Sequence, residues 1–311
     1  MNTFSRSSKI AVVGAGAVGC YFGGMLARHG ADVTFIARAQ HVDAIQDRGL
    51  YMECLDFQEY VPVKASSDIS AAAGSDVVLL CVKSPDTEVA GLQLQPLLPP
   101  HTVILSLQNG VDNVPRLQQL LPQRVFPAVV YVATAMAGPG HLKHNGRGEL
   151  VIGEMPFTGE HQETLRSLAG LLAEAGIPCE VSERVKDALW FKFLINCVYN
   201  AVSAIGQIEY GRMVQVPEVR QLMDQLTQEF LLVAAAEGVH YAPEMVRDSL
   251  EGINRSMAGQ RSSTAQDLAR GKHTEMDHLN GLLVRLGQQH GIPTPSHRAV
   301  HALVKLLESA L

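Results

Sequence analysis

The feature that most constrains this chain is a glycine pattern near its start, Gly14-x-Gly16-x-x-Gly19, preceded by the apolar run Ile10 to Val13. A segment typical of a helix, Tyr21 to His29, follows it. Strand, glycine turn and helix in this order are the context of a dinucleotide-binding fingerprint, in which backbone N–H groups and the helix dipole receive phosphates. We therefore predict a cofactor cradle made of Gly14, Ala15, Gly16, Ala17, Val18 and Gly19.

The end of the second predicted strand, Asp32 to Ile36, bears on the choice of cofactor. An NAD site usually carries Asp or Glu there to bind the ribose 2′-hydroxyl, whereas an arginine accommodates the 2′-phosphate of NADP. This chain has Arg38 there and no acidic residue before Asp43. A solvated surface arginine would also fit the position, but its place in the motif favours NADP(H).

Composition narrows the class of protein. A length of 311 residues suggests two domains, and 47% hydrophobic with 18% charged residues is ordinary for a soluble globular chain. The net charge of -6 argues against nucleic acid or an anionic membrane as partner. We see no apolar run of the roughly 20 residues that a membrane span needs. The five cysteines are scattered without a CxxC pair, which favours a reducing compartment, so we expect a cytoplasmic protein without a structural metal.

Two further apolar runs, Ser75 to Val82 and Thr102 to Leu107, suit strands buried on both faces of a parallel sheet. The first run is followed by Lys83 and the second by Gln108-Asn109-Gly110. Ligands in such folds lie outside the carboxyl ends of the strands, so we place Lys83 and Asn109 beside the cofactor. Taken singly, a solvated loop lysine and a turn-forming asparagine would explain them better, but their shared place at strand ends of one sheet weakens that explanation.

The remaining elements divide the chain into an α/β part and an all-α part. Before residue 183 we predict helices at 41–48 and 160–175, one or two strands in 50–63, a β-rich run at 124–137 that pairs antiparallel with 150–153, and a last strand at 177–181. After it we predict only helices, at 185–205, 216–237, 243–257, 274–289 and 296–310. The predicted domains are therefore 1–183 and 184–311.

The first of these helices carries an unusual polar stripe. Lys192, Asn196 and Asn200 are spaced i, i+4, i+8 on an otherwise apolar helix, which places them on one face. A solvated stripe would account for a lysine more easily than for two asparagines, which are modest helix formers. We therefore predict that the stripe lines a substrate site.

A second polar group runs from Arg261 to Gly281 and contains Glu275. Its residues His273, Asp277 and His278 could suggest a metal, but histidines and acids at helix starts more often cap the helix or face solvent. Glu275 would be favourable in a first helical turn through the helix dipole alone.

Together these residues resemble the ketopantoate reductases (2-dehydropantoate 2-reductases) over nearly the full chain. The resemblance rests on the glycine motif, on the Lys192 to Asn200 block, and on Ser263 and Asp267 ahead of His273-Thr274-Glu275-x-Asp277-x-x-Asn280-Gly281. It implies a Rossmann-type dinucleotide-binding domain followed by an all-α domain like the C-terminal domain of 6-phosphogluconate dehydrogenase. It further implies NADPH-dependent reduction of 2-dehydropantoate to (R)-pantoate, a step of pantothenate and coenzyme A biosynthesis.

The resemblance also implies roles for individual residues. Lys192 would be the proton donor, with Glu275 assisting, and Asn196, Asn200 and Ser263 would hold the substrate. Asn109 would lie by nicotinamide and substrate, while Arg38 and Lys83 would serve the 2′-phosphate end. The chemistry is consistent with this, because hydride transfer to a 2-keto carbon leaves an alkoxide that needs a general acid.

One position departs from the family pattern, since Tyr210 stands where the family often has an asparagine that contacts substrate. The alternative is therefore a D-2-hydroxyacid dehydrogenase for another branched or aromatic 2-keto acid. A non-catalytic NADP-binding sensor is a third reading, which the presence of Lys192 and Glu275 disfavours. The long apolar helices would allow a homodimer.

Overall fold

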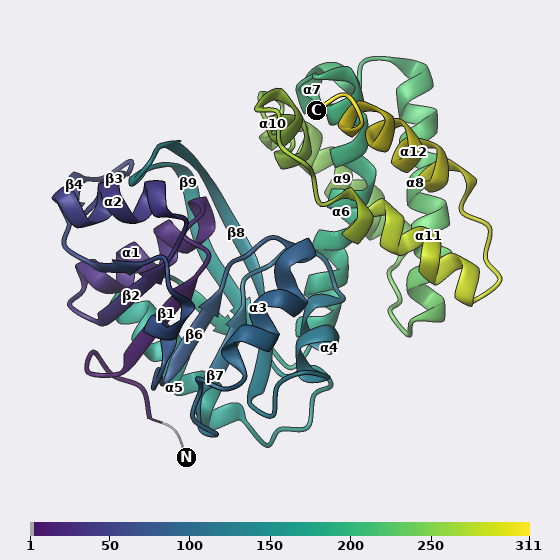
Figure 1. Cartoon of the computed structure of the whole chain (residues 1–311). Coiled ribbons are helices and arrows are strands. Elements are labelled where there is room, and N and C mark those ends of the chain that lie inside the picture. The colour runs from purple at the N-terminus through teal and green to yellow at the C-terminus, as the bar shows by residue number, and fades with distance from the viewer. Residues whose placement is uncertain (1–2) are drawn as a thin grey trace. The chain divides into compact units, whose positions relative to one another are not determined.

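The computed structural model describes residues 3–311, which fall into two compact units, one ending at Leu189 and the other spanning Trp190–Leu311 (Figure 1). The predicted domain boundary after residue 183 falls just before helix α6, Val185–Gly206, whose first five residues belong to the first unit.

The first unit is built on one curled, mixed sheet in the order β4-β3-β9-β8-β7-β6-β1-β2-β5, with β10 paired to β9. Its strands are β1 (Lys9–Val13), β2 (Asp32–Ile36), β3 (Leu50–Glu53), β4 (Gln58–Val61), β5 (Lys64–Ser66), β6 (Val77–Leu80), β7 (Val103–Ser106), β8 (Arg124–Gly138), β9 (His141–Ile152) and β10 (Cys179–Val181). The predicted strand Asp32 to Ile36 is confirmed, as is the buried character of the two later runs, since all residues of β6 and β7 are buried.

Helices cover the sheet on both faces, as in a Rossmann-type fold. They are α1 (Ala17–Arg28), α2 (Ala39–Arg48), α3 (Thr87–Leu94), α4 (Asn113–Gln118) and α5 (Gln162–Glu174), with short 3-10 turns η1 (Ile69–Ala72) and η2 (Ser84–Asp86). Strand residues alternate between two cores: Val12 packs with Phe22 of α1 and Leu168 of α5, whereas Val13 packs with the α3 and α4 side. The predicted α/β class is therefore confirmed.

Strand β5 and helix α4 were not predicted, and two other elements of this unit differ in length from the sequence prediction. Helix α1 begins at Ala17 rather than Tyr21, although glycines disfavour helix interiors. Close packing requires them: a Cβ on Gly23 would lie 2.6 Å from Val12 Cγ2, and one on Gly24 would lie 2.6 Å from Met52 Sδ. Strand β9 is also longer than the predicted strand at 150–153. Its pairing with β8 contains irregularities, and these allow the glycine-rich segment before residue 150 to remain part of the strand.

The second unit is all-helical, as predicted. After α6 it contains α7 (Tyr210–Met213), α8 (Pro217–Ala236), α9 (Pro243–Ser256), α10 (Ser263–Ala269), the 3-10 turn η3 (Met276–His278), α11 (Asn280–Gln289) and α12 (Pro295–Glu308). Helices α7 and α10 were not predicted. The single helix predicted over 274–289 is wrong, because Leu279 (φ -110°, ψ -104°) separates η3 from α11.

Helix α6 corrects one statement made from the sequence. This helix of 22 residues is long and apolar enough to cross a membrane, whereas the sequence analysis found no apolar run of that length. However, 61% of its most apolar window is buried inside the protein, which is the behaviour of a core helix.

Candidate functional site

The glycine motif forms the turn between β1 and α1. Gly14 has φ +101°, and a Cβ there would lie 2.7 Å from the backbone nitrogen of Val82. A Cβ on Gly19 would lie 2.3 Å from the carbonyl oxygen of Gly14, so this glycine lets the helix start close to the strand. Both positions therefore require glycine for reasons internal to the fold.

Gly16 differs from these two, because no atom lies within 4 Å of the place where its Cβ would be. It is exposed, it is the N-cap of α1, and no side chain caps that helix. The first turn of α1 also carries no acidic residue. The first N–H groups of the helix are thus open to an anion, and a bare backbone at Gly16 leaves room for phosphate oxygens.

The other cofactor candidates of this unit lie at the same edge of the sheet. In the parallel register Val13 pairs with both Ile36 and Leu80, and Leu80 pairs with Ser106, so the carboxyl ends of β1, β2, β6 and β7 are neighbours. Three predicted residues lie just beyond these ends. Arg38 is the exposed N-cap of α2, Lys83 is the half-buried N-cap of η2, and Asn109 lies in the loop after β7. The structure therefore brings the predicted cofactor residues together along one edge.

A buried polar network, which sequence reasoning missed, holds the loop that carries Asn109. The Asn113 side-chain amide donates to the carbonyl oxygen of Asn109 (2.7 Å), and the Ser84 hydroxyl donates to the same oxygen (3.2 Å). Thr87 donates to Asn113 Oδ1 (2.8 Å) and accepts from Gln108 Nε2 (2.7 Å). Since all four side-chain partners are buried, the loops after β6 and β7 are fixed to each other.

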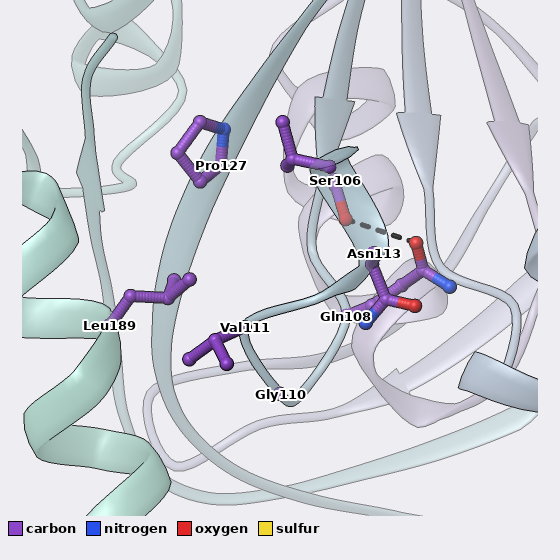
Figure 2. Close-up of a pocket in the computed structure, with 8 residues that line it drawn as sticks. Ser106, Gln108, Gly110, Val111, Asn113, Pro127 and Leu189 are labelled. Atoms are coloured by element: carbon purple, nitrogen blue, oxygen red, sulfur yellow. Dashed lines mark hydrogen bonds between the residues drawn. The ribbon is translucent and has the colours of Figure 1, made fainter. Parts of the chain in front are cut away.

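A cavity of about 10 Å³, just enough for one water molecule, adjoins this network (Figure 2). Ser106, which donates to Gln108 Oε1 (3.0 Å), lies on its polar side with Asn113, while Val111 and Leu189 line its apolar side. In the sequence Gln108 stands out only as a polar residue just after a predicted strand, and nothing there points to Asn113.

In the second unit, α6 carries the predicted stripe. Lys192 and Asn196 are half-buried, whereas Asn200 is 3% exposed. The carbonyl oxygen of Asn200 accepts a hydrogen bond from the Ser262 hydroxyl (3.1 Å), and the backbone N–H of Ser262 donates to Ser203 Oγ (3.2 Å). The start of α10 is therefore fixed to the C-terminal half of α6.

This arrangement separates the roles of two adjacent serines. Ser262 is buried and caps α10 by accepting from the N–H of Ala265 (3.0 Å), so its hydroxyl is used structurally. Ser263, the predicted substrate residue, is the exposed first residue of that helix. The placement leaves Ser263 accessible beside α6.

Glu275 is the half-buried N-cap of η3. The residue before it, Thr274, is anchored by Glu308, which accepts from its backbone N–H at 2.7 Å. After η3, the Asn280 amide donates to the carbonyl oxygen of Cys197 on α6 (2.9 Å). These two anchors fix the segment with Glu275 against the rest of the unit and tie it to the stripe helix.

Tyr210, the departure from the family pattern, is 6% exposed. Its ring lies 4.8 Å from that of Tyr199, whose hydroxyl donates to Asn254 Oδ1 (2.7 Å). Burial raises the pKa of Tyr210, so its phenol stays protonated. An effect of Tyr210 on a substrate would therefore act through the packing of α6 and α9.

Among the described residues, 3–311, no three His, Cys, Asp or Glu side chains are grouped so that they could hold a metal ion. The five cysteines are free thiols. Burial raises the pKa of Cys20 to about 12, which keeps this thiol next to the glycine turn in its unreactive form.

Comparison with known proteins gives matches over both units. Residues 10–156 match the family model "Ketopantoate reductase PanE/ApbA" and residues 184–308 match "Ketopantoate reductase PanE/ApbA C terminal". A protein of Pyrococcus horikoshii named 2-dehydropantoate 2-reductase is 31% identical over 309 residues, covering 97% of this chain and 98% of that protein.

Two solved structures are similar throughout. A PanE/ApbA family ketopantoate reductase from Ralstonia eutropha JMP134 has a TM-score of 0.91 and 53% identity, covering 97% of this chain and 99% of that one. D-mandelate dehydrogenase in complex with NADH has a TM-score of 0.88 and 25% identity, with 97% and 99% covered.

Proposed function

The chain belongs to the ketopantoate reductase family and is an oxidoreductase of the 2-dehydropantoate 2-reductase type; we propose that its reaction is the reduction of 2-dehydropantoate to (R)-pantoate with NADPH. This reaction would serve pantothenate and coenzyme A biosynthesis. The observation that carries the proposal is the full-length match to the family with the Lys192, Asn196 and Asn200 stripe intact.

The first unit would bind the cofactor. The backbone from Gly14 to Gly19 fits a pyrophosphate, since Gly16 is open and the N-terminus of α1 is uncapped. Arg38 would bind the 2′-phosphate, because its guanidinium can form charge-assisted hydrogen bonds to it, and Lys83 would add a second positive charge. When bound, the dinucleotide supplies the hydride for the 2-keto carbon. Asn109, fixed through its carbonyl by Asn113, would lie beside the nicotinamide and the substrate.

The second unit would bind the substrate and deliver the proton. Lys192 would protonate the carbonyl oxygen as hydride arrives, which as general acid catalysis contributes about 10²–10⁴ in rate. The amides of Asn196 and Asn200 and the hydroxyl of Ser263 suit a substrate with a carboxylate and a hydroxyl, because they satisfy oxygen atoms without adding charge. Glu275 would support Lys192 in this role.

A small substrate panel tests the proposal. NADPH oxidation by the purified protein is followed by absorbance with ketopantoate, 2-ketoisovalerate, phenylglyoxylate or no substrate. Preference for ketopantoate is the expected result. If NADPH binds but none of the keto acids is turned over, the proposed reaction is refuted and a cofactor-binding sensor is favoured.

A second candidate is a D-2-hydroxyacid dehydrogenase for another branched or aromatic 2-keto acid. Two points favour it: by the resemblance, Tyr210 stands where the family often has an asparagine, and D-mandelate dehydrogenase with NADH is among the similar structures. Preference for phenylglyoxylate in the same panel would select this candidate. A cytoplasmic location and a homodimer stay predictions, the second of which light scattering of the purified protein would test.

A further inference from the structure

One face of α12 carries three polar side chains to which the proposed reaction gives no role. His301, Lys305 and Glu308 are spaced i, i+4, i+7, which places them together on this helix. Glu308 is the last residue of α12, where a carboxylate is unfavourable to the helix dipole, and it is 5% exposed. A buried charge in this position needs partners, and its partners indicate what it does.

Glu308 holds the residue just before Glu275. Its Oε1 accepts from the backbone N–H of Thr274 (2.7 Å) and from the Thr274 hydroxyl. That hydroxyl also accepts from the backbone N–H of Met276 (3.2 Å), so one buried side chain spans the backbone on both sides of Glu275. The second oxygen of Glu308, Oε2, is paired with Lys305 Nζ (2.6 Å). Burial alone would raise the pKa of Glu308, but the hydrogen bonds from Lys305 and Thr274 outweigh it and lower the pKa, so the carboxylate is ionised.

The other end of the same face holds the residue two positions after Glu275. Asp277 Oδ1 lies 2.8 Å from His301 Nε2, and Asp277 Oδ2 accepts from Lys305 Nζ (2.9 Å). Gly281, near the start of α11, makes room for this contact, since a Cβ there would lie 2.9 Å from His301 Nε2. The polar face of α12 therefore clamps the chain both before and after Glu275.

We propose that Glu308 is a positioning residue for the reaction: through Thr274 it sets the backbone conformation at Glu275 and so the direction in which that carboxylate is presented. The inference rests on the function proposed above, in which Glu275 supports the proton donor Lys192. It holds for any 2-keto acid substrate, because the carbonyl oxygen to be protonated is common to all of them. An ionised carboxylate suits this task, since its hydrogen bonds are stronger than those of a neutral acceptor.

The test measures kcat and KM of the full chain with the keto acid that the wild type reduces fastest, and NADPH affinity separately by titration. Glu308→Ala removes the acceptor and Thr274→Val removes only the hydroxyl, and each should lower kcat about tenfold or more. The dissociation constant of NADPH should change by less than about twofold, because the proposed cofactor residues belong to the first unit. Glu308→Gln keeps an oxygen that can accept from the Thr274 N–H and should recover most of the lost kcat.

Double variants distinguish positioning from a general loss of structure. If Glu308 acts through Glu275, Glu308→Ala should lower kcat no further once Glu275 is replaced by alanine, and the same holds for Thr274→Val. A merely structural role would multiply the two losses instead. The matched control is Glu251→Ala, which removes an exposed glutamate of α9 and its ion pair with Arg255 and should leave kcat unchanged in either background.

Thr274→Val is nearly isosteric, so it carries the test together with Glu308→Gln if Glu308→Ala does not fold. The inference is overturned if the Glu308 and Thr274 variants keep the kcat of the wild type, or if their losses multiply with that of Glu275→Ala. Failure of the proposed function gives a different result, in which the wild type reduces no keto acid or Glu275→Ala leaves kcat unchanged. Either of these would overturn the positioning role as well.

Discussion

The buried His297 should make the stability of the second unit depend on pH. Its side chain is fully buried: Nε2 lies 2.9 Å from the carbonyl oxygen of Leu226, and Nδ1 lies 2.9 Å from the amide nitrogen of Asn280. A neutral imidazole satisfies both contacts if Nε2 donates and Nδ1 accepts. A protonated ring would instead direct an N–H at the Asn280 amide, which already donates to Cys197.

Burial therefore lowers the pKa of His297 from 6.5 to about 4. The unfolded chain binds this proton more readily than the folded one, so the free energy of unfolding falls as the pH drops below about 6.5 and reaches its full loss below about 4. The difference corresponds to about 3 kcal/mol, of which about 2 kcal/mol should be lost between pH 8 and pH 5.

Urea unfolding followed by tryptophan fluorescence would measure this loss, because the one tryptophan, Trp190, is 3% exposed and packs against Phe193 and Phe230 in the same unit. His297→Gln keeps a donor and an acceptor but cannot take up the proton. The stability gap between wild type and this variant should therefore shrink by about 2 kcal/mol from pH 8 to pH 5. His240→Gln, at an exposed position, is the control and should show a constant gap. A constant gap for His297→Gln as well would refute the reasoning.

Three further predictions concern the residues proposed to bind the cofactor and the substrate. Lys192→Ala should lower kcat about 10²–10⁴-fold while NADPH still binds, with exposed Lys272→Ala as control; activity within a few-fold of wild type would exclude the acid role. Arg38→Ala should weaken NADPH binding roughly 10- to 100-fold and NADH binding far less, with exposed Arg166→Ala as control; equal effects on both dinucleotides would remove the 2′-phosphate argument. Asn113→Ala removes the shorter of the two hydrogen bonds to the Asn109 carbonyl and the acceptor of the buried Thr87 hydroxyl, and should lower the free energy of unfolding of the first unit by about 1–3 kcal/mol, measured by hydrogen exchange; unchanged protection there would contradict it.

The sequence predicts the parts of the fold that follow from local pattern. A buried parallel strand is apolar throughout, and its carboxyl end is where ligands lie, so the positions of Lys83 and Asn109 beyond β6 and β7 follow from two short runs. The Lys192, Asn196 and Asn200 stripe follows in the same way from helical periodicity.

What the sequence does not predict depends on contacts between distant residues. The added first turn of α1 contains Gly19, whose close approach to Gly14 and Val12 depends on the fold and is not visible in the poor helix propensity of glycine. The partners of Asn113 are set by the pairing of β6 with β7 rather than by neighbours in the sequence. Nothing local distinguishes Ser262, which caps a helix, from Ser263 beside it.

The residues proposed to bind the cofactor in the first unit and those proposed to bind the substrate in the second are held in place by different means. In the first unit the proposed pyrophosphate cradle is backbone, and it is held by Gly14 and Gly19, whose neighbours leave no room for a side chain. In the second it is formed by side chains on α6, and that helix is fixed by hydrogen bonds from Ser262 and Asn280 to its carbonyl oxygens. If these assignments hold, substitution on or behind α6, as at Tyr210, would change substrate specificity and leave the proposed dinucleotide cradle intact. We accordingly expect variation within this family to alter the keto acid more readily than the fold of the cofactor site.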